Sequence, residues 1–357
     1  MSVLSPSRPR RDGADIEIRP GVVLIHPTIR EIGVRILQDG ADVTMAPDGR
    51  EATLIATLNA VKARAMVIRV EHATRCIFEA APSLEIVAMH GVGTDTIDVD
   101  AATDAGVLVL NAPLVNFKST AEHTLALLMT VAKNVMRGDQ AVRTGAFADF
   151  RDRHLPMEIE GRSIFIIGLG RVGSEMARKC RAAFNMRVMA YDPLYDVDAM
   201  AAKGVERVSM EKGYAEADFV TVHVPLKADT RGLIDTRAFA AMKKGAIFLN
   251  VARGPVMDQK ALLHALQSGH LAGAGLDVFA SEPVPADDPI VTAPNVILSP
   301  HYGGDTVAAR NRCSETIARS VLKALAGSQL DGVVNPEVLT QPNYRLGAAL
   351  AQQISGR

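Results

Sequence analysis

Hydrophobic and polar positions divide most of this chain into short apolar runs and longer amphipathic segments that follow one another in turn. The apolar runs are rich in β-branched residues, whereas segments such as 51–63 repeat apolar residues at helical spacing. Continuous apolar runs are typical of parallel strands buried on both faces. We predict strands at 22–25, 66–70, 85–88, 107–110, 163–167, 187–191, 219–222, 246–249, 274–276 and 296–298. This order predicts an α/β protein with two open, doubly wound parallel-sheet domains.

Helical periodicity predicts three longer helices. The segment 121–137 places Leu125 and Leu128 on one side, and it leads from the first predicted domain into the second. A second helix is predicted from Asp258 to residue 267, because an aspartate is a favourable N-cap. The third helix is predicted over 306–326.

The bulk composition excludes several classes of partner. With 48% hydrophobic residues, 22% charged residues and a formal net charge of −1, the chain creates no global field that would attract nucleic acid or an acidic membrane. No apolar run approaches the roughly 18 residues of a membrane span. The first 20 residues lack the apolar segment of a secretory signal, and they are predicted to be a poorly ordered leader. Partners are therefore expected to be small molecules or a second copy of the chain.

The cysteines indicate the compartment. Cys76, Cys180 and Cys313 are scattered and odd in number, with no spacing typical of metal ligands. This arrangement argues against a disulfide framework and against a zinc site. It favours a reducing environment, and we predict a cytoplasmic protein.

A glycine-rich turn follows the predicted strand 163–167. Gly168 permits a tight turn, Gly170 lets the backbone approach a pyrophosphate, and Gly173 lets the following helix pack closely on the strand. The pyrophosphate would lie at the helix N-terminus, where backbone N–H groups and the helix dipole favour an anion. The same glycines are also compatible with a purely structural turn, but the strand before them and the helix after them favour a dinucleotide.

An acidic residue at the end of the next predicted strand supports this interpretation. Asp192 lies about 20 residues beyond the glycines, where a carboxylate can accept hydrogen bonds from the adenosine ribose hydroxyls. It would repel a 2′-phosphate, and no Arg or Lys occupies the four positions that follow. We therefore predict NAD, with NADH as its reduced form, rather than NADP.

Polar residues follow several strands at one edge of the second predicted sheet, where doubly wound proteins bind ligands. Reduction of a 2-oxo acid by a nicotinamide creates an alkoxide, and His301 is a suitable proton donor. Glu282 would raise the pKa of His301, and Arg253 can bind the substrate carboxylate and polarise the carbonyl. Backbone N–H groups around Val92 and Gly93 could hold the other carboxylate oxygen.

Structural roles are the alternative for several of these residues. Arg253 and Glu282 could form an ordinary ion pair, which is common among loop residues. His223, also at a strand end, is more typical of a packing histidine. The other histidines that lack such a setting are read as structural: His26, His72, His123, His154, His264 and His270.

These motifs resemble the D-isomer-specific 2-hydroxyacid dehydrogenases over about 22–336. The matching segments are 90–98, 111–113, 119–122, 168–173, 223–226, 250–254, 277–283 and 299–301. The resemblance implies that Arg253, Glu282 and His301 are catalytic and that Asp277 lies near the nicotinamide carboxamide. The residues that it implies along the cofactor are Gly168, Gly170, Arg171, Val172, Gly173, Asp192, Val251, Ala252, Arg253, His301 and Gly303.

The resemblance also implies an organisation of the chain. It predicts two Rossmann-like domains with a cleft between them that closes on substrate. The substrate-binding domain would be discontinuous, with residues 21–120 and 305–336, and the NAD-binding domain would comprise 121–304. Residues 1–20 and 337–357 would be a leader and a tail. Family members are similar in forming homodimers through the cofactor domain.

Within the family, the segment 111–119 looks most like the phosphoglycerate dehydrogenase type. Met89 departs from that type, which usually carries an arginine there to hold a phosphate. We therefore favour hydroxypyruvate, glyoxylate or another small 2-oxo acid, with Asn116 and Lys118 on the substrate side, and Lys118 leaves a second anionic group possible. Formate dehydrogenases are less similar, because they carry a glutamine at the position of Glu282.

Three alternatives remain open at this stage. The first is a 3-phosphoglycerate dehydrogenase. The second is a non-catalytic, NAD-sensing scaffold similar to the corepressors related to this family. The third is a related oxidation, such as that of phosphite. Turnover of a panel of 2-oxo acids, together with an assay of phosphite and NAD, would distinguish them.

Overall fold

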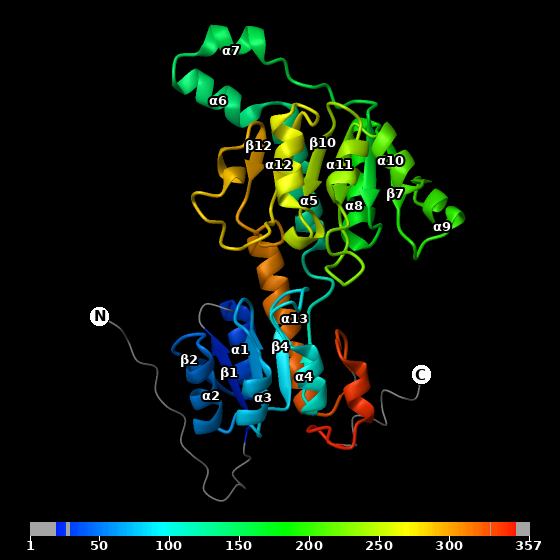
Figure 1. Ribbon diagram of the computed structural model, residues 1–357. Helices are drawn as coiled ribbons and strands as arrows, with labels where there is room; N and C mark the ends of the chain where they lie inside the picture. Colours follow the sequence, from blue (N-terminus) through cyan, green and yellow to red (C-terminus); the bar gives the residue numbers. More distant parts are fainter. Residues whose placement is uncertain (1–18, 26–28, 329, 348–357) are drawn as a thin grey trace, which may run out of the picture. The chain divides into compact units, whose positions relative to one another are not determined.

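A computed structural model of the protein describes residues 19–25, 29–328 and 330–347, which divide into two compact units (Figure 1). Unit 1 contains the described residues up to Val115 and those from Arg310 onward, and unit 2 is Asn116–Ala309. Each unit has its own parallel sheet with helices on both faces, which confirms the predicted α/β, doubly wound class. The predicted leader lies almost entirely outside the described residues.

The sheet of unit 1 has the strand order β2-β1-β3-β4-β5, and every pair is parallel. Its strands are β1 (Gly21–Ile25), β2 (Asp42–Ala46), β3 (Ala65–Ile68), β4 (Ile86–Met89) and β5 (Leu108–Leu110). Successive residues of β1 face opposite sides of the sheet. Leu24 packs against one helical layer and Val23 against the other. The first layer is formed by α1 (Glu31–Gly40) and α13 (Val307–Leu325), and the second by α2 (Glu51–Ala60), α3 (Arg75–Ala80) and α4 (Val99–Asp104).

The segment after α13 corrects the predicted tail. The short helix η3 (Pro336–Thr340) contributes Val338 to the core of unit 1, and Tyr344 is buried in the same cluster. The Arg345 guanidinium donates hydrogen bonds to the carbonyls of Phe78, Ala81 and Leu84 at 3.0, 3.1 and 2.8 Å. The chain through residue 345 is therefore part of unit 1, and residues 348–357 lie outside the described part.

The sheet of unit 2 has the order β12-β11-β10-β9-β6-β7-β8, again with parallel pairs. Its strands are β6 (Ser163–Ile167), β7 (Arg187–Tyr191), β8 (Glu206–Arg207), β9 (Phe219–Val222), β10 (Ile247–Asn250), β11 (Gly273–Leu276) and β12 (Val296–Leu298). The chain runs outward from β6 to β8 and then resumes at β9 on the other side of β6. The switch point between β6 and β9 is where doubly wound sheets bind ligands.

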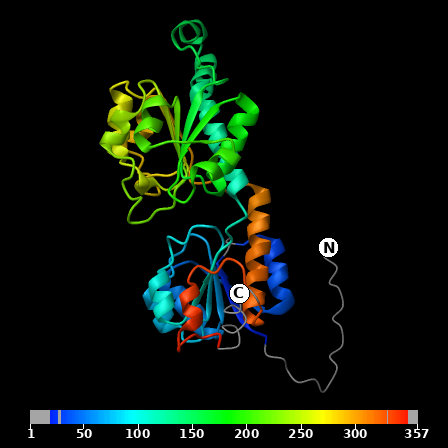
Figure 2. The ribbon, with the colours of Figure 1, turned by 90° about the vertical axis from the view of Figure 1, so that its right-hand side faces the viewer.

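Helices cover both faces of this sheet (Figure 2). One layer contains α5 (Phe117–Ala132), α8 (Arg171–Phe184) and α9 (Val197–Ala202), and the other contains α10 (Met210–Glu216), α11 (Thr236–Ala241) and α12 (Gln259–Gln267). Asp258 caps α12, since its carboxylate accepts the N–H groups of Lys260 and Ala261. Short 3-10 helices follow β10 (η1, Gly254–Val256) and precede β12 (η2, Pro289–Thr292).

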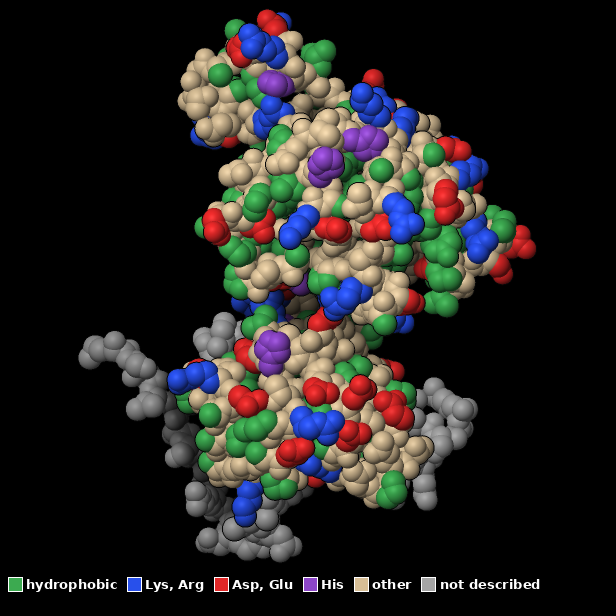
Figure 3. Space-filling view, in the orientation of Figure 1, with side chains coloured by type: hydrophobic (Ala, Val, Ile, Leu, Met, Phe, Trp, Pro, Cys, Tyr) green, Lys and Arg blue, Asp and Glu red, His purple; other side chains and the backbone are tan. Residues whose placement is uncertain are grey.

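The predicted helix 121–137 is instead two helices. Helix α5 ends at Ala132, Asn134 adopts a left-handed conformation with φ 53°, and α6 (Val135–Arg143) and α7 (Phe147–Arg153) follow. We call residues 135–155 the arm. Hydrophobic and charged side chains lie side by side on its surface (Figure 3), and its large exposed hydrophobic residues are Val135, Met136, Val142, Phe147 and Leu155. Among the described helices, none is long and apolar enough to cross a membrane.

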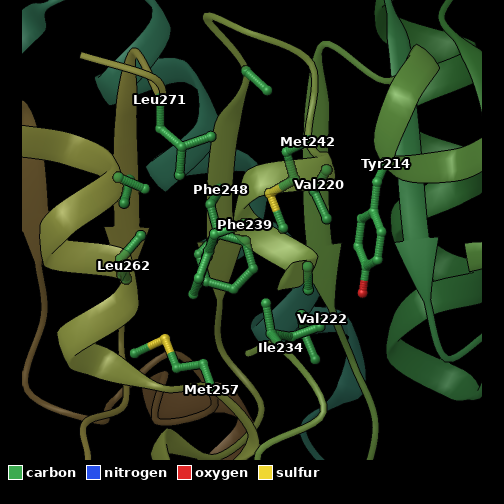
Figure 4. Packing of buried hydrophobic residues seen from close by; sticks show 14 of the residues in the cluster. Tyr214, Val220, Val222, Ile234, Phe239, Met242, Phe248, Met257, Leu262 and Leu271 are labelled. Atoms are coloured by element: carbon green, nitrogen blue, oxygen red, sulfur yellow. The ribbon is translucent and has the colours of Figure 1, made fainter. Parts of the chain in front are cut away.

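A buried hydrophobic cluster fixes the helices α10 to α12 against the strands (Figure 4). Phe239 of α11 and Phe248 of β10 meet edge to face, with ring centroids 5.1 Å apart. Leu262 of α12 is fully buried beside them. Burial of an aromatic or aliphatic side chain of this size contributes about 1.5–3 kcal/mol. The cluster therefore anchors α10, α11 and α12 to the central strands of the sheet.

Candidate active site

The predicted catalytic and cofactor-binding residues of unit 2 follow β6, β7, β10, β11 and β12, and so they gather at one edge of its sheet. Parallel strands bring their carboxyl ends to the same edge, so this placement follows from the topology. Gly168, Arg253, Glu282 and His301 each come from a different loop. Arg171 and Val172 begin α8 at the same edge, and Val251 and Ala252 follow β10.

The glycine loop after β6 has the space that a dinucleotide needs. Gly168 has φ 91°, and a Cβ on Gly173 would lie 2.1 Å from the Gly168 carbonyl oxygen, so both positions require glycine. A Cβ on Gly170, by contrast, would meet nothing within 4 Å. The backbone is therefore open in front of Gly170, directly before the first turn of α8. An open backbone at a helix N-terminus fits a pyrophosphate.

Asp192 ties this loop to the end of β7. Its carboxylate accepts the N–H groups of Leu169 at 2.8 Å and Leu194 at 2.9 Å, and the residue is 8% exposed. A carboxylate has about four lone-pair positions, so it retains acceptor capacity for ribose hydroxyls. The sequence indicated only the ribose contact, and the structure adds this role in shaping the loop.

His301 and Glu282 form a hydrogen-bonded pair. His301 Nδ1 lies 2.6 Å from Glu282 Oε2, and Glu282 Oε1 accepts the Phe279 N–H at 2.9 Å. The bond with Glu282 raises the pKa of His301, although burial and the charge of Arg253 oppose the shift. Burial would raise the pKa of Glu282, but the bonds from His301 and Phe279 lower it overall. Because Nδ1 is held by Glu282, Nε2 is the nitrogen that can exchange a proton with a ligand.

Arg253 lies on the loop after β10, and Asn250 shapes that loop. The fully buried Asn250 side chain accepts the Ala252 N–H at 3.0 Å and donates to the Arg253 carbonyl at 3.1 Å. A Cβ on Gly254 would lie 1.7 Å from the Phe279 carbonyl oxygen, so this loop packs tightly against the loop after β11. The charge of Arg253 favours a lower pKa for both Glu282 and His301, but the bond with Glu282 outweighs it at His301, whose pKa is raised overall.

A second network surrounds Asp277, which is 2% exposed. Its carboxylate accepts the Ser299 hydroxyl at 2.6 Å and the backbone N–H groups of Tyr302 and Gly303 at 3.1 and 2.9 Å. Burial would raise the pKa of Asp277, but these bonds and His123 lower it. His123, on α5, lies 2.8 Å from Ser299 Oγ through its Nε2. The sequence assigned His123 no such setting, because no local pattern shows which loop a helix residue will meet.

The remaining candidates lie in different surroundings. Burial lowers the pKa of His223 to about 3, so this side chain is neutral near pH 7, and its Nε2 lies 3.0 Å from Thr221 Oγ1. Asn116 occupies the N-cap position of α5 without a capping hydrogen bond from its side chain, and it lies against Gly304. Lys118 is exposed on α5, with its ammonium 6.0 Å from the centroid of the Phe117 ring. His26 lies outside the described residues.

Val92 and Gly93 belong to unit 1, on the loop after β4. Asn111 Nδ2 donates to the Val92 carbonyl at 2.7 Å, which anchors this loop to the residue after β5. Met89 stands at the position where the phosphoglycerate dehydrogenase type usually carries a phosphate-binding arginine. It is 3% exposed and packs in the core of unit 1. Its side chain is therefore part of the hydrophobic core.

Comparisons with known proteins place these features in context. The family model described as D-isomer specific 2-hydroxyacid dehydrogenase, NAD binding domain, matches residues 125–303, which lie within unit 2. D-3-phosphoglycerate dehydrogenase of Mycobacterium leprae is 40% identical over 326 residues, covering 89% of this chain and 60% of that protein. Glyoxylate reductase of Korarchaeum cryptofilum is 42% identical over 265 residues, covering 74% of this chain and 80% of that protein.

A solved structure is also similar. The holo form of D-mandelate dehydrogenase from Rhodotorula graminis has a TM-score of 0.82 and 28% identity, covering 88% of this chain and 97% of that one. This chain spans about 60% of the length of the phosphoglycerate dehydrogenases that it matches. Together these similarities confirm the family predicted from the motifs.

Proposed function

Since the chain belongs to the D-isomer-specific 2-hydroxyacid dehydrogenase family, we propose that it is an NAD-dependent oxidoreductase that interconverts a 2-oxo acid and its D-2-hydroxy acid. The observation that carries the proposal is the 2.6 Å bond between His301 Nδ1 and Glu282 Oε2, at a sheet edge that also holds Arg253 and the glycine loop. A histidine with a raised pKa can donate a proton near neutral pH.

Each side chain has a chemical role in this proposal. When bound, NADH supplies the hydride that reduces the carbonyl carbon. His301 Nε2 donates a proton to the developing alkoxide, and Glu282 stabilises the imidazolium and holds the ring. Arg253 binds the carboxylate and polarises the carbonyl, because its planar guanidinium can form two parallel hydrogen bonds. In unit 1, the backbone N–H groups of Val92 and Gly93 are the proposed ligands of the other carboxylate oxygen.

NAD, rather than NADP, is the proposed cofactor. The Asp192 carboxylate would accept ribose hydroxyls and repel a 2′-phosphate, and the residues that follow it are Pro193, Leu194, Tyr195 and Asp196. Asp277 is the proposed acceptor for the nicotinamide carboxamide, and Gly303 lies directly beside its carboxylate. Arg171, Val172, Val251 and Ala252 complete the proposed cofactor contacts at the same edge.

We favour a small 2-oxo acid such as glyoxylate or hydroxypyruvate as substrate. A relative that this chain covers over most of its length is named glyoxylate reductase, which supports that choice. A second candidate is 3-phosphohydroxypyruvate, because relatives of similar identity are named D-3-phosphoglycerate dehydrogenase. Lys118, with Asn116 as its neighbour at the start of α5, is the proposed contact for a second anionic group in that case.

The proposed assembly is a homodimer that forms through unit 2. The arm supports this proposal, because its five exposed hydrophobic side chains are between 51% and 80% exposed. Exposed apolar surface is typical of protein contacts where it is contiguous, and all five side chains lie within residues 135–155. The scattered cysteines support a reducing, cytoplasmic location.

The test is NADH consumption at neutral pH with glyoxylate, hydroxypyruvate, pyruvate, phosphohydroxypyruvate and bulkier 2-oxo acids, repeated with NADPH. We expect the highest kcat/KM with glyoxylate or hydroxypyruvate and a clear preference for NADH. A preference for phosphohydroxypyruvate would instead favour the second candidate. Protein that binds NADH and reduces no member of the panel would contradict the proposed reaction.

A further inference from the structure

The backbone at His301 is strained, so the surrounding residues must hold it. His301 has φ 50°, in the left-handed region that residues with a side chain seldom occupy. Such a conformation persists only where neighbouring contacts over-determine it. Within the segment 299–303, the His301 N–H donates to the Ser299 carbonyl at 3.1 Å, a local contact that does not by itself connect the segment to the rest of unit 2.

His123 supplies a contact from outside that segment. Its Nε2 lies 2.8 Å from Ser299 Oγ, and its ring meets the Tyr302 ring edge to face, with centroids 5.1 Å apart. A Cβ on Gly303 would lie 2.8 Å from His123 Cδ2, so the ring also lies close against this glycine. The imidazole on α5 therefore contacts residues on both sides of His301.

The same imidazole orders the buried carboxylate of Asp277. The Ser299 hydroxyl donates its proton to Asp277 Oδ1 at 2.6 Å, so Ser299 Oγ can only accept a bond from His123. This requires a proton on His123 Nε2, a tautomer inferred from the bonding pattern. His123 Nε2 is also 3.5 Å from Asp277 Oδ1. One N–H group thus orients both the serine and the carboxylate.

We propose that His123 is a positioning residue, which holds Asp277 and the His301 segment in the geometry needed at the nicotinamide end of the cofactor site. The proposal rests on the proposed function, because that function assigns the reaction to His301 and the carboxamide to Asp277. A histidine with only a structural role would stabilise the fold. Its loss would not affect the nicotinamide end of a bound dinucleotide more than the adenosine end. His123 is only 18% exposed, so stability alone cannot decide between these roles.

The test compares NADH with ADP-ribose, which lacks the nicotinamide. His123→Leu removes the N–H donor, whereas His123→Gln keeps a donor at similar reach. We expect His123→Leu to weaken NADH binding about tenfold, which is the loss of one hydrogen bond to a charged network. ADP-ribose affinity should change less than about twofold, and His123→Gln should recover most of the NADH affinity. Titration calorimetry on the full chain measures all of these affinities without turnover.

His270→Leu is the matched control. His270 Nε2 also donates one hydrogen bond, to the Met242 carbonyl at 2.9 Å, but His270 precedes β11 and so lies at the opposite edge of the sheet. This variant should lower the melting temperature as His123→Leu does and leave the ratio of NADH to ADP-ribose affinity unchanged. In turnover assays, kcat should fall about tenfold in His123→Leu and not in His270→Leu.

Two results would overturn the proposal. One is an equal loss of NADH and ADP-ribose affinity in His123→Leu, and the other is unaltered binding of both. These outcomes differ from failure of the proposed reaction. If the proposed reaction is wrong, the wild-type protein will bind NADH but reduce no 2-oxo acid. In that case the affinity ratio still decides whether His123 positions the nicotinamide end.

Discussion

His301 and Glu282 come from loops after different strands, and a 2.6 Å bond between Nδ1 and Oε2 joins them. The pair leaves Nε2 for proton exchange, and it raises the pKa of His301 while Glu282 stays ionised. A raised pKa keeps the imidazole protonated over a wider pH range. We therefore expect the pH dependence of both directions of the proposed reaction to depend on this bond.

Replacing Glu282 with glutamine should shift the pH profile. Glu282→Gln keeps a hydrogen-bond acceptor for His301 but removes the charge, so the pKa of His301 should fall. Reduction needs protonated His301, and its alkaline limb should move to lower pH, with about a tenfold loss of kcat/KM near pH 8. Oxidation needs neutral His301, and its acid limb should also move to lower pH. Profiles of kcat/KM in both directions measure these shifts.

The matched control for that experiment is Glu315→Gln on α13, whose carboxylate accepts a hydrogen bond from Arg319 at 3.0 Å on the helix surface. Both limbs should stay in place in this variant. If neither limb of the pH profiles moves in Glu282→Gln, the His301–Glu282 pair does not set the catalytic pKa.

Removing the His301 imidazole should abolish proton transfer without removing the cofactor. His301→Asn is preferable to alanine, because asparagine tolerates the positive φ of this position. We expect reduction to fall by about 10²–10⁴-fold, the usual contribution of a general acid. The dissociation constant for NADH, measured by fluorescence titration, should change by less than about threefold. A parallel loss of binding and turnover would place His301 in cofactor binding rather than in acid catalysis.

Asp192 should determine both cofactor preference and loop stability. In Asp192→Ala the ratio of kcat/KM for NADH to that for NADPH should fall at least about tenfold, because the carboxylate that repels a 2′-phosphate is gone. The free energy of unfolding should also fall by about 1–3 kcal/mol, since the Leu169 and Leu194 N–H groups lose their acceptor. Asp198→Ala, on the exposed face of α9, removes the same charge and should change neither quantity. An unaltered cofactor ratio would contradict the ribose assignment.

Arg345 should stabilise unit 1. Its guanidinium satisfies three carbonyls at and beyond the end of α3, so Arg345→Leu should lower the free energy of unfolding by about 2–3 kcal/mol. Arg319→Leu, which removes a surface pair with Glu315, should cost less than about 0.5 kcal/mol. Urea denaturation of the full chain measures both. Equal stability of the two variants would show that the Arg345 hydrogen bonds add nothing to the stability of unit 1.

Most strands could be predicted from the sequence because each is a continuous apolar run buried on both faces. The strands 163–167, 187–191 and 219–222 were predicted with the bounds that the structure has. Strands β2 and β8 were missed because each lies at the edge of its sheet, where partly exposed residues break the apolar pattern. The break between α5 and α6 was also missed, because Asn134 is neither glycine nor proline and helical periodicity continues across it.

By itself the sequence determined the family, the fold class and the order in which candidate residues follow the strands, because these depend on local patterns and spacing. Only the tertiary structure decided which side chains touch: that Asp192 also binds the loop after β6, that Arg345 belongs to unit 1, and that His123 reaches Ser299 from α5. Positions 123 and 299 are 176 residues apart along the chain. Contacts at such separation arise only when helices pack on a folded sheet, and no local pattern of residue types encodes them.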